Sequence, residues 1–66
     1  MIRVTSNAVA AARELRPVAI DNGDMAMAMD CRILIDGWML GRAVPVEIMR
    51  NVREMAWEVR QAELAV

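Results

Sequence analysis

The most constraining feature of this sequence is an alternating run from residue 25 to residue 35. Every odd position in the run is apolar, and most of the even positions between them are small or charged. Successive side chains leave a β-strand on opposite sides, so this alternation is typical of a strand with one buried face. The pattern predicts a strand whose core-facing residues are Met25, Met27, Met29, Cys31, Ile33 and Ile35.

Two turn signals flank the run and predict one common register. Asn22-Gly23 and Asp36-Gly37 are dipeptides that favour two-residue β-hairpin turns. Because directly opposite residues share a face of a sheet, both turns place the neighbouring apolar residues on the odd side of the central strand. We therefore expect a three-stranded antiparallel meander, with strands at about residues 18–20, 25–35 and 38–43.

A helix from Asp24 to Gly37 is the alternative that the same residues allow. Met and Ala favour helices, Asp24 suits an N-cap and Gly37 suits a C-cap. Such a helix would be apolar on nearly every side, and a small domain has little means of burying it. The strand is therefore the preferred interpretation.

Helices are expected on both sides of the meander. Residues 5–7 are three candidate N-caps before an Ala-rich segment at 8–16, and Pro17 is expected to end that first helix. A second helix is expected from Pro45 almost to the C-terminus. Its apolar residues recur at helical spacing, at Ile48, Val52, Met55, Val59 and Ala62. The predicted fold is an α+β domain of order α-β-β-β-α, in which two helices pack on one face of a three-stranded antiparallel meander.

The composition predicts one small domain that binds something else. A chain of 66 residues buries only a thin core, yet 58% of these residues are hydrophobic, against the usual ~45–50%. The surplus apolar surface predicts an interface with a second copy of the chain or with another protein. The whole sequence, 1–66, is expected to form this single domain.

The charges and targeting signals exclude several partners. The net charge is −1 and all eight positive side chains are Arg, so no general attraction to nucleic acid or anionic lipid is expected. The start of the chain has no apolar segment long enough for a signal peptide, and no run approaches a membrane span. The expected location is the cytoplasm.

The sequence offers little for catalysis. It has no His to act as a base near neutral pH and no phosphate-binding loop. Thr5 and Ser6 are explained as helix caps, and Cys31 lies on the predicted buried side, where a thiol is inert. We therefore expect a non-enzymatic protein without a cofactor.

Two groups of side chains resemble metal ligands. Spacing of two residues along a strand would place the sulfurs of Met25, Met27, Met29 and Cys31 on one side, as a Cu(I) site requires. Core packing is the preferred interpretation, since Met fills irregular cores well. Four aspartates at 21, 24, 30 and 36 also invite a metal, but three of them flank turns, where Asp is favoured for backbone reasons. No metal is expected.

The C-terminal helix carries the candidate binding surface. Trp57 lies about 180° from Ile48 on a helical wheel, opposite the apolar stripe. Trp and Arg are enriched in interface hot spots, so an exposed Trp edged with Arg indicates a protein interface. The alternative is that Arg53 stacks on the indole and the surface stays unused. The predicted partner-binding residues are Trp57, Leu64, Arg50, Arg53 and Arg60.

The predicted order of elements resembles that of double-stranded-RNA-binding domains. That family has a Lys-rich start to its last helix, whereas residues 42–47 here read Arg-Ala-Val-Pro-Val-Glu. The expected function is therefore a protein-binding inhibitor or adaptor of phage or mobile-element type, acting as a homodimer. It is like anti-CRISPR proteins in size and lack of motifs only. The alternative is a small nucleic-acid-binding regulator that uses the arginines of the last helix.

Overall fold

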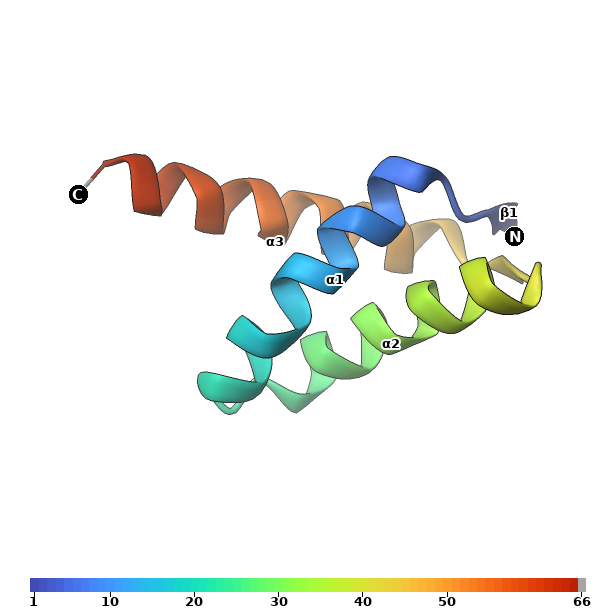
Figure 1. Ribbon diagram of the computed structural model, residues 1–66, viewed down its shortest axis with the longest axis horizontal. Helices are drawn as coiled ribbons and strands as arrows, with labels where there is room; N and C mark the ends of the chain where they lie inside the picture. Colours follow the sequence, from blue (N-terminus) through green and yellow to red (C-terminus); the bar gives the residue numbers. More distant parts are fainter. Residues whose placement is uncertain (66) are drawn as a thin grey trace.

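The chain forms three helices and one short two-stranded sheet within residues 1–65, which the computed structural model describes. The elements follow the order β1 (Ile2–Arg3), α1 (Ser6–Asp21), α2 (Met25–Leu40), β2 (Ala43–Val44) and α3 (Val46–Leu64). Figure 1 shows α1 and α2 joined by a tight turn, with α3 running back past both from the end that holds β1. The predicted α-β-β-β-α meander is therefore wrong, and so is the resemblance in element order that depended on it.

Residues 25–35 form the first part of α2, so the helix given above as the alternative is the correct interpretation. Asp24 caps the start, where the backbone N–H of Met27 donates to Oδ1 of Asp24 over 3.1 Å. The predicted alternative helix ended at Gly37, whereas α2 continues to Leu40. Its C-cap is Gly41, whose φ of 67° is left-handed. The predicted strand at 38–43 is divided between the end of α2 and the first residue of β2.

Burial along α2 follows a helical spacing and not an alternating one. The buried residues recur at every third position: Ala28, Cys31, Leu34 and Gly37. The alternation misleads because Leu34, an even position placed outside by the strand, is fully buried, while Met25 and Met29 are each 56% exposed. Because apolar residues occupy both odd and even positions of this run, the run is compatible with the period of a strand and with that of a helix. Only the tertiary contacts select the helix.

The Asn22-Gly23 turn joins two helices instead of two strands. A type I′ hairpin turn needs positive φ at both residues, but φ is −88° at Asn22 and 73° at Gly23. The N–H of Gly23 donates to the carbonyl of Ile20, and the N–H of Asp24 to that of Ala19 over 2.8 Å. This bonding pattern is the one by which a left-handed glycine ends a helix. The predicted strand at 18–20 is therefore the last turn of α1.

Pro17 lies inside α1 and does not end it. An interior proline lacks an N–H and crowds a carbonyl of the preceding turn, at a cost of about 3 kcal/mol. Leu15 and Ala19 on either side of it are buried, so packing outweighs the local preference. The start of α1 is as predicted, since the backbone N–H of Ala8 donates to Oγ1 of Thr5 over 3.1 Å.

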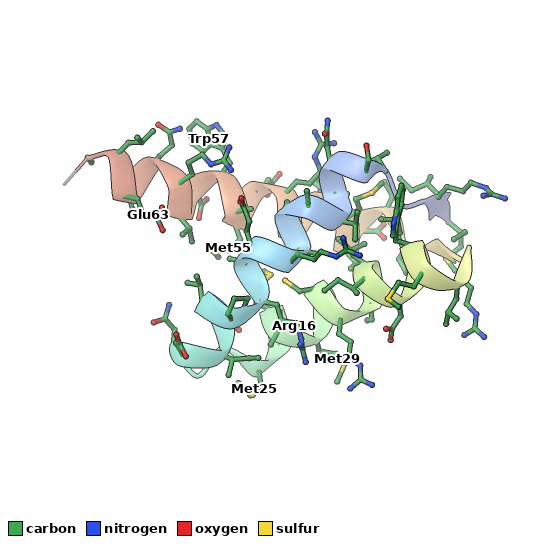
Figure 2. The ribbon with its side chains drawn as sticks, viewed as in Figure 1. Arg16, Met25, Met29, Met55, Trp57 and Glu63 are labelled. Atoms are coloured by element: carbon green, nitrogen blue, oxygen red, sulfur yellow. The ribbon has the colours of Figure 1, made fainter. Side chains whose placement is uncertain are left out.

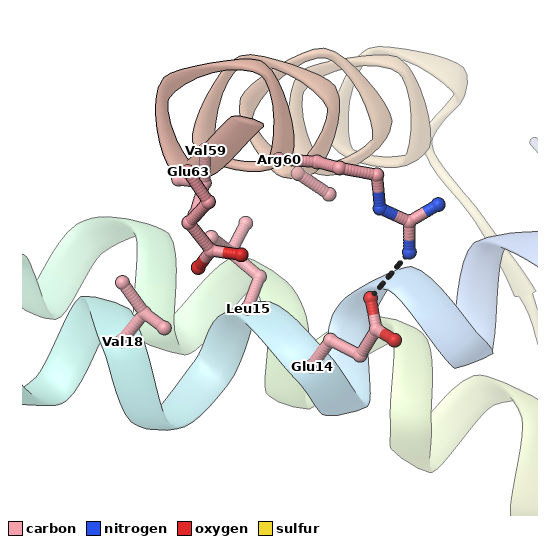
Figure 3. A pocket seen from close by; sticks show the side chains of 7 residues that line it. Glu14, Leu15, Val18, Val59, Arg60 and Glu63 are labelled. Carbon is pink, nitrogen blue, oxygen red and sulfur yellow. Dashed lines mark hydrogen bonds and ion pairs between the residues drawn. The ribbon is translucent and has the colours of Figure 1, made fainter. Parts of the chain in front are cut away.

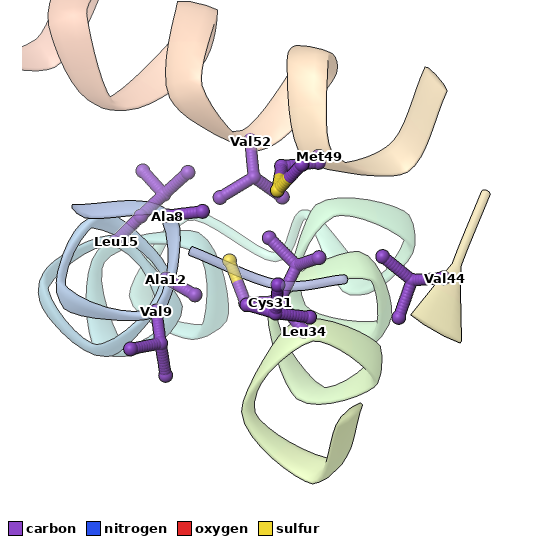
Figure 4. Packing of buried hydrophobic residues seen from close by; sticks show 10 residues of the cluster. Ala8, Val9, Ala12, Leu15, Cys31, Leu34, Val44, Met49 and Val52 are labelled. Carbon is purple, nitrogen blue, oxygen red and sulfur yellow. The ribbon is translucent and has the colours of Figure 1, made fainter. Parts of the chain in front are cut away.

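The core lies where the three helices meet. Figure 4 shows Val52 and Met49 pointing from α3 toward α1 and α2. On α1 the side that faces the core is rich in small residues, including the fully buried Ala8 and Ala12, which lets the helices approach closely. The larger side chains that are fully buried are Leu34, Val52 and Cys31.

Gly37 is buried where the two strands cross α2, and the Asp36-Gly37 hairpin turn predicted there is absent. The strands pair antiparallel, Ile2 opposite Val44, and we call this two-stranded sheet the clasp. A Cβ on Gly37 would lie 2.8 Å from Cγ1 of Val44 and 3.1 Å from the carbonyl oxygen of Arg42. The missing side chain therefore lets the clasp pack directly on the helix.

Gly37→Ala is expected to lower the free energy of unfolding by about 1 kcal/mol. Helix propensity alone favours Ala by about 1 kcal/mol, while overpacking typically costs about 1–3 kcal/mol. Overpacking dominates because Val44 is buried and the carbonyl of Arg42 belongs to the backbone. Urea unfolding measures the change, and Ala26→Gly at an exposed position of α2 calibrates the propensity term. An increase in stability equal to the loss in Ala26→Gly would contradict the close approach at Gly37.

Candidate protein-binding surface

The face of α3 that packs on the core follows the predicted amphipathic pattern. Val52 is buried, and Ile48, Met55 and Val59 are half-buried. Met49 is also buried, which the sequence pattern did not single out, and Ala62 is exposed because it lies beyond the core. The predicted stripe therefore gives the direction of the inward side correctly, but it omits Met49 and extends one turn too far.

Trp57 and Leu64 lie on the other side of α3. Trp57 is 64% exposed and Leu64 is 74% exposed. Figure 2 shows the Trp57 side chain on the outer side of α3, directed away from α1 and α2. Arg50 and Arg53 are exposed on the same helix, and within residues 1–65 neither takes part in an ion pair. We call these four residues the outer face of α3.

Arg60 is separated from the outer face of α3 by an ion pair. Its Nη2 donates to Oε2 of Glu14 over 3.0 Å and so links α3 to α1, as Figure 3 shows. Both side chains are largely exposed, and such pairs contribute about 0–1 kcal/mol. The contact directs the Arg60 side chain toward α1, whereas Trp57 is directed away from α1 (Figure 2).

The ion pair borders a cleft of about 290 Å³ between α1 and α3. The floor of the cleft is aliphatic, and its ionisable groups are Glu14, Glu63 and Arg60. Figure 3 shows Glu63 extending over the side of the cleft where Leu15 and Val18 lie. This set contains neither a thiol nor a hydroxyl group that could act as a nucleophile.

The four sulfurs at positions 25–31 do not share one side. Met25 and Met29 are one helical turn apart and exposed, whereas Met27 is half-buried and Cys31 is fully buried. The predicted burial is therefore wrong for Met25 and Met29 and correct for Cys31. Among the described residues, no group of three or more His, Cys, Asp or Glu side chains could hold a metal ion.

Two of the four aspartates have clear structural roles. Asp24 is the N-cap of α2, and Oδ2 of Asp36 lies 3.6 Å from Nε of Arg32, one turn earlier. Asp21 is the last residue of α1, and Asp30 is half-buried in α2. Only Asp24 plays the local backbone role expected of an aspartate beside a turn.

Cys31 is expected to react slowly with thiol reagents. Its burial raises the pKa of the thiol from 9.0 to about 11, with Asp30 adding to the rise and Arg16 opposing it. At mildly alkaline pH the folded chain then holds about a hundredfold fewer thiolates than the unfolded chain. The thiol of Cys31 binds its proton more tightly in the folded state than in the unfolded state. The contribution of this difference to the free energy of unfolding is therefore fully present below pH 9.0 and is lost as pH rises toward 11.

The measurement for Cys31 is the rate of reaction with a chromogenic disulfide, with and without urea. The reaction is expected to be slow in native buffer and much faster once urea unfolds the chain. The urea concentration at the midpoint of unfolding should decrease as the pH is raised from 9.0 to 11. Cys31→Ala, used as the control, should remove this pH dependence. Rapid reaction of the native thiol would show that Cys31 is accessible.

A second exposed apolar region lies at the end of α2. Trp38 is 44% exposed, Met39 is 69% exposed and Leu40 is 60% exposed. Three consecutive apolar residues cover nearly all sides of a helix end, so the short core cannot bury all of them. The alternating pattern did not predict this region, because it placed residues 38–40 in a strand.

The molecule therefore presents exposed apolar side chains on the outer face of α3 and at the end of α2, besides Met25 and Met29 near the start of α2. Over the same residues, no helix is both long and apolar enough to span a bilayer. In comparisons with protein-family models, with curated proteins and with solved structures, no match to this chain was found.

Proposed function

We propose that this chain is a small non-enzymatic accessory protein that binds another protein through the outer face of α3. The observation that carries the proposal is the exposure of Trp57, 64%, and of Leu64, 74%, opposite the core of the same helix. Trp and Arg are the side chains most enriched in interface hot spots, and Arg50 and Arg53 accompany the indole. A Trp in this position contributes little to the monomer, so binding is the role that accounts for it.

The first partner that we propose is a second copy of the chain. A 66-residue chain with 58% hydrophobic residues has more apolar surface than its core can bury. A symmetric dimer covers such surface by pairing the same patch of both copies. As a homodimer or as a monomer, the protein would then act as an inhibitor or adaptor of phage or mobile-element type in the cytoplasm. Size and lack of catalytic motifs support this part of the proposal.

Nucleic-acid binding is the alternative that Arg50 and Arg53 favour, since both are exposed. The same helix also exposes Glu47, Glu54 and Glu58, and the net charge of the chain is −1. These carboxylates would repel a phosphate backbone that approached α3. A protein partner is therefore the better supported choice.

The experiment uses Trp57 as its own reporter. Trp38→Phe leaves Trp57 as the only tryptophan, and its quenching by acrylamide is followed from micromolar to millimolar protein while sedimentation gives the mass. The proposal expects quenching to fall as the mass doubles. Trp57→Phe removes the indole from the proposed interface, so its mass should double only at a higher protein concentration than that of Trp38→Phe.

Two results would contradict the proposal. If the mass doubles while Trp57 stays fully quenchable, another face forms the interface. If the chain stays monomeric and instead binds a labelled oligonucleotide in a strongly salt-dependent manner, the nucleic-acid alternative replaces the protein partner.

A further inference from the structure

A small groove lies between the C-terminal end of α2 and the clasp, at the end of the molecule where Figure 1 labels β1. It has a volume of about 150 Å³. An apolar cavity of this order accommodates a group the size of one benzene ring. The groove is lined by Arg3, Val4, Gly37, Trp38, Gly41 and Arg42. We call it the clasp groove.

The fold itself brings these residues together. Arg3 comes from β1, and Arg42 follows the left-handed Gly41 that ends α2. The N–H of Arg42 donates to the carbonyl of Gly37 over 2.8 Å, which holds this segment against the helix. Two arginines that are far apart in sequence therefore border the same groove as one indole.

Charge in the clasp groove has a single sign. Arg3 and Arg42 are its only ionisable lining groups, and within residues 1–65 neither forms an ion pair. The carboxylate next to the groove in sequence, Asp36, is 3.6 Å from Nε of Arg32. Both guanidinium groups are therefore free to bind an anion from outside, and their planar donors match a carboxylate.

We propose that the clasp groove binds an acidic segment of a partner protein. Arg3 and Arg42 hold a carboxylate of that segment, and a neighbouring apolar side chain packs on the indole of Trp38, which is 44% exposed. This site is distinct from the outer face of α3, and its test does not depend on that proposal.

A protein carboxylate fits this groove better than a nucleic acid does. Two arginines on a chain of net charge −1 make a local contact and not an extended basic track. The apolar residues beside them match alternating acidic and apolar side chains, whereas a phosphate backbone would leave that surface uncovered.

The experiment follows the fluorescence of Trp38 in a Trp57→Phe background. The probe is a hexapeptide of alternating Glu and Leu, acetylated and amidated, and the matched peptide carries Gln in place of Glu. The proposal expects a saturable change with the Glu peptide, weakened by salt, and none with the Gln peptide. Arg3→Gln combined with Arg42→Gln should weaken binding by about tenfold or more, since two charge-assisted contacts are lost.

Arg13→Gln combined with Arg60→Gln is the control, because it removes the same charge from exposed positions outside both the groove and the outer face of α3. Circular dichroism during thermal unfolding checks that both double variants fold. The proposal is overturned if the Glu peptide gives no saturable change, if the Gln peptide binds equally, or if both double variants lose affinity alike. It is also overturned if a single-stranded oligonucleotide binds Trp38 more tightly than the Glu peptide does.

Discussion

Leu34→Ala is expected to lower the free energy of unfolding by about 3 kcal/mol. Leu34 is fully buried at the junction of the three helices, and removing a buried Leu side chain typically costs about 2–5 kcal/mol. A chain of this size has a total stability of roughly 3–10 kcal/mol, so the variant should unfold at a much lower urea concentration. Ala is itself a strong helix former, so the loss reports packing and not helix propensity.

Met29→Ala is the matched control for Leu34→Ala. Met29 lies on the same helix, is 56% exposed, and should change stability by less than about 0.5 kcal/mol. The pair also discriminates between the helix and the strand first expected at 25–35, because in the strand Met29 faces the core and Leu34 faces outward. A larger loss in Met29→Ala than in Leu34→Ala would contradict the burial pattern of α2.

Trp57→Ala is expected to weaken association by about 2 kcal/mol or more while leaving the folded monomer nearly unchanged. A hot-spot Trp commonly contributes this much to an interface, yet Trp57 lies outside the monomer core. The variant should therefore change the dimerisation constant without changing the free energy of unfolding of the monomer. Thermal unfolding at low protein concentration measures the monomer, and sedimentation equilibrium measures the dimerisation constant.

Arg60→Gln provides the contrast for Trp57→Ala. Arg60 is bonded to Glu14 and directed toward α1, so its loss should leave association intact and alter stability by at most about 1 kcal/mol. Unchanged association in Trp57→Ala would remove the outer face of α3 as the interface. Unfolding of the monomer in that variant would show that α3 packs through the Trp57 side.

The candidate surface could be predicted from the sequence only where one helix determines it. Trp57 and Leu64 lie seven positions apart, so their common side follows from the geometry of α3 alone. Arg60 was assigned to the same surface, but its partner Glu14 is 46 positions away in the chain. The clasp groove was not predicted, because Arg3 and Arg42 line one groove only when β1 pairs with β2.

The sequence by itself determined α3 and placed the start of α1 within residues 5–7, because these depend on a single local period or a single capping hydrogen bond. Cys31 is buried as expected, but on a helical side and not on the strand face from which its burial was inferred. The tertiary structure alone decided α2. Its apolar residues satisfy both a period of two and a helical period, so the local pattern left two comparable solutions. Packing of Leu34 in the core and of the clasp on Gly37 selects the helix, since both contacts require those residues on one helical side.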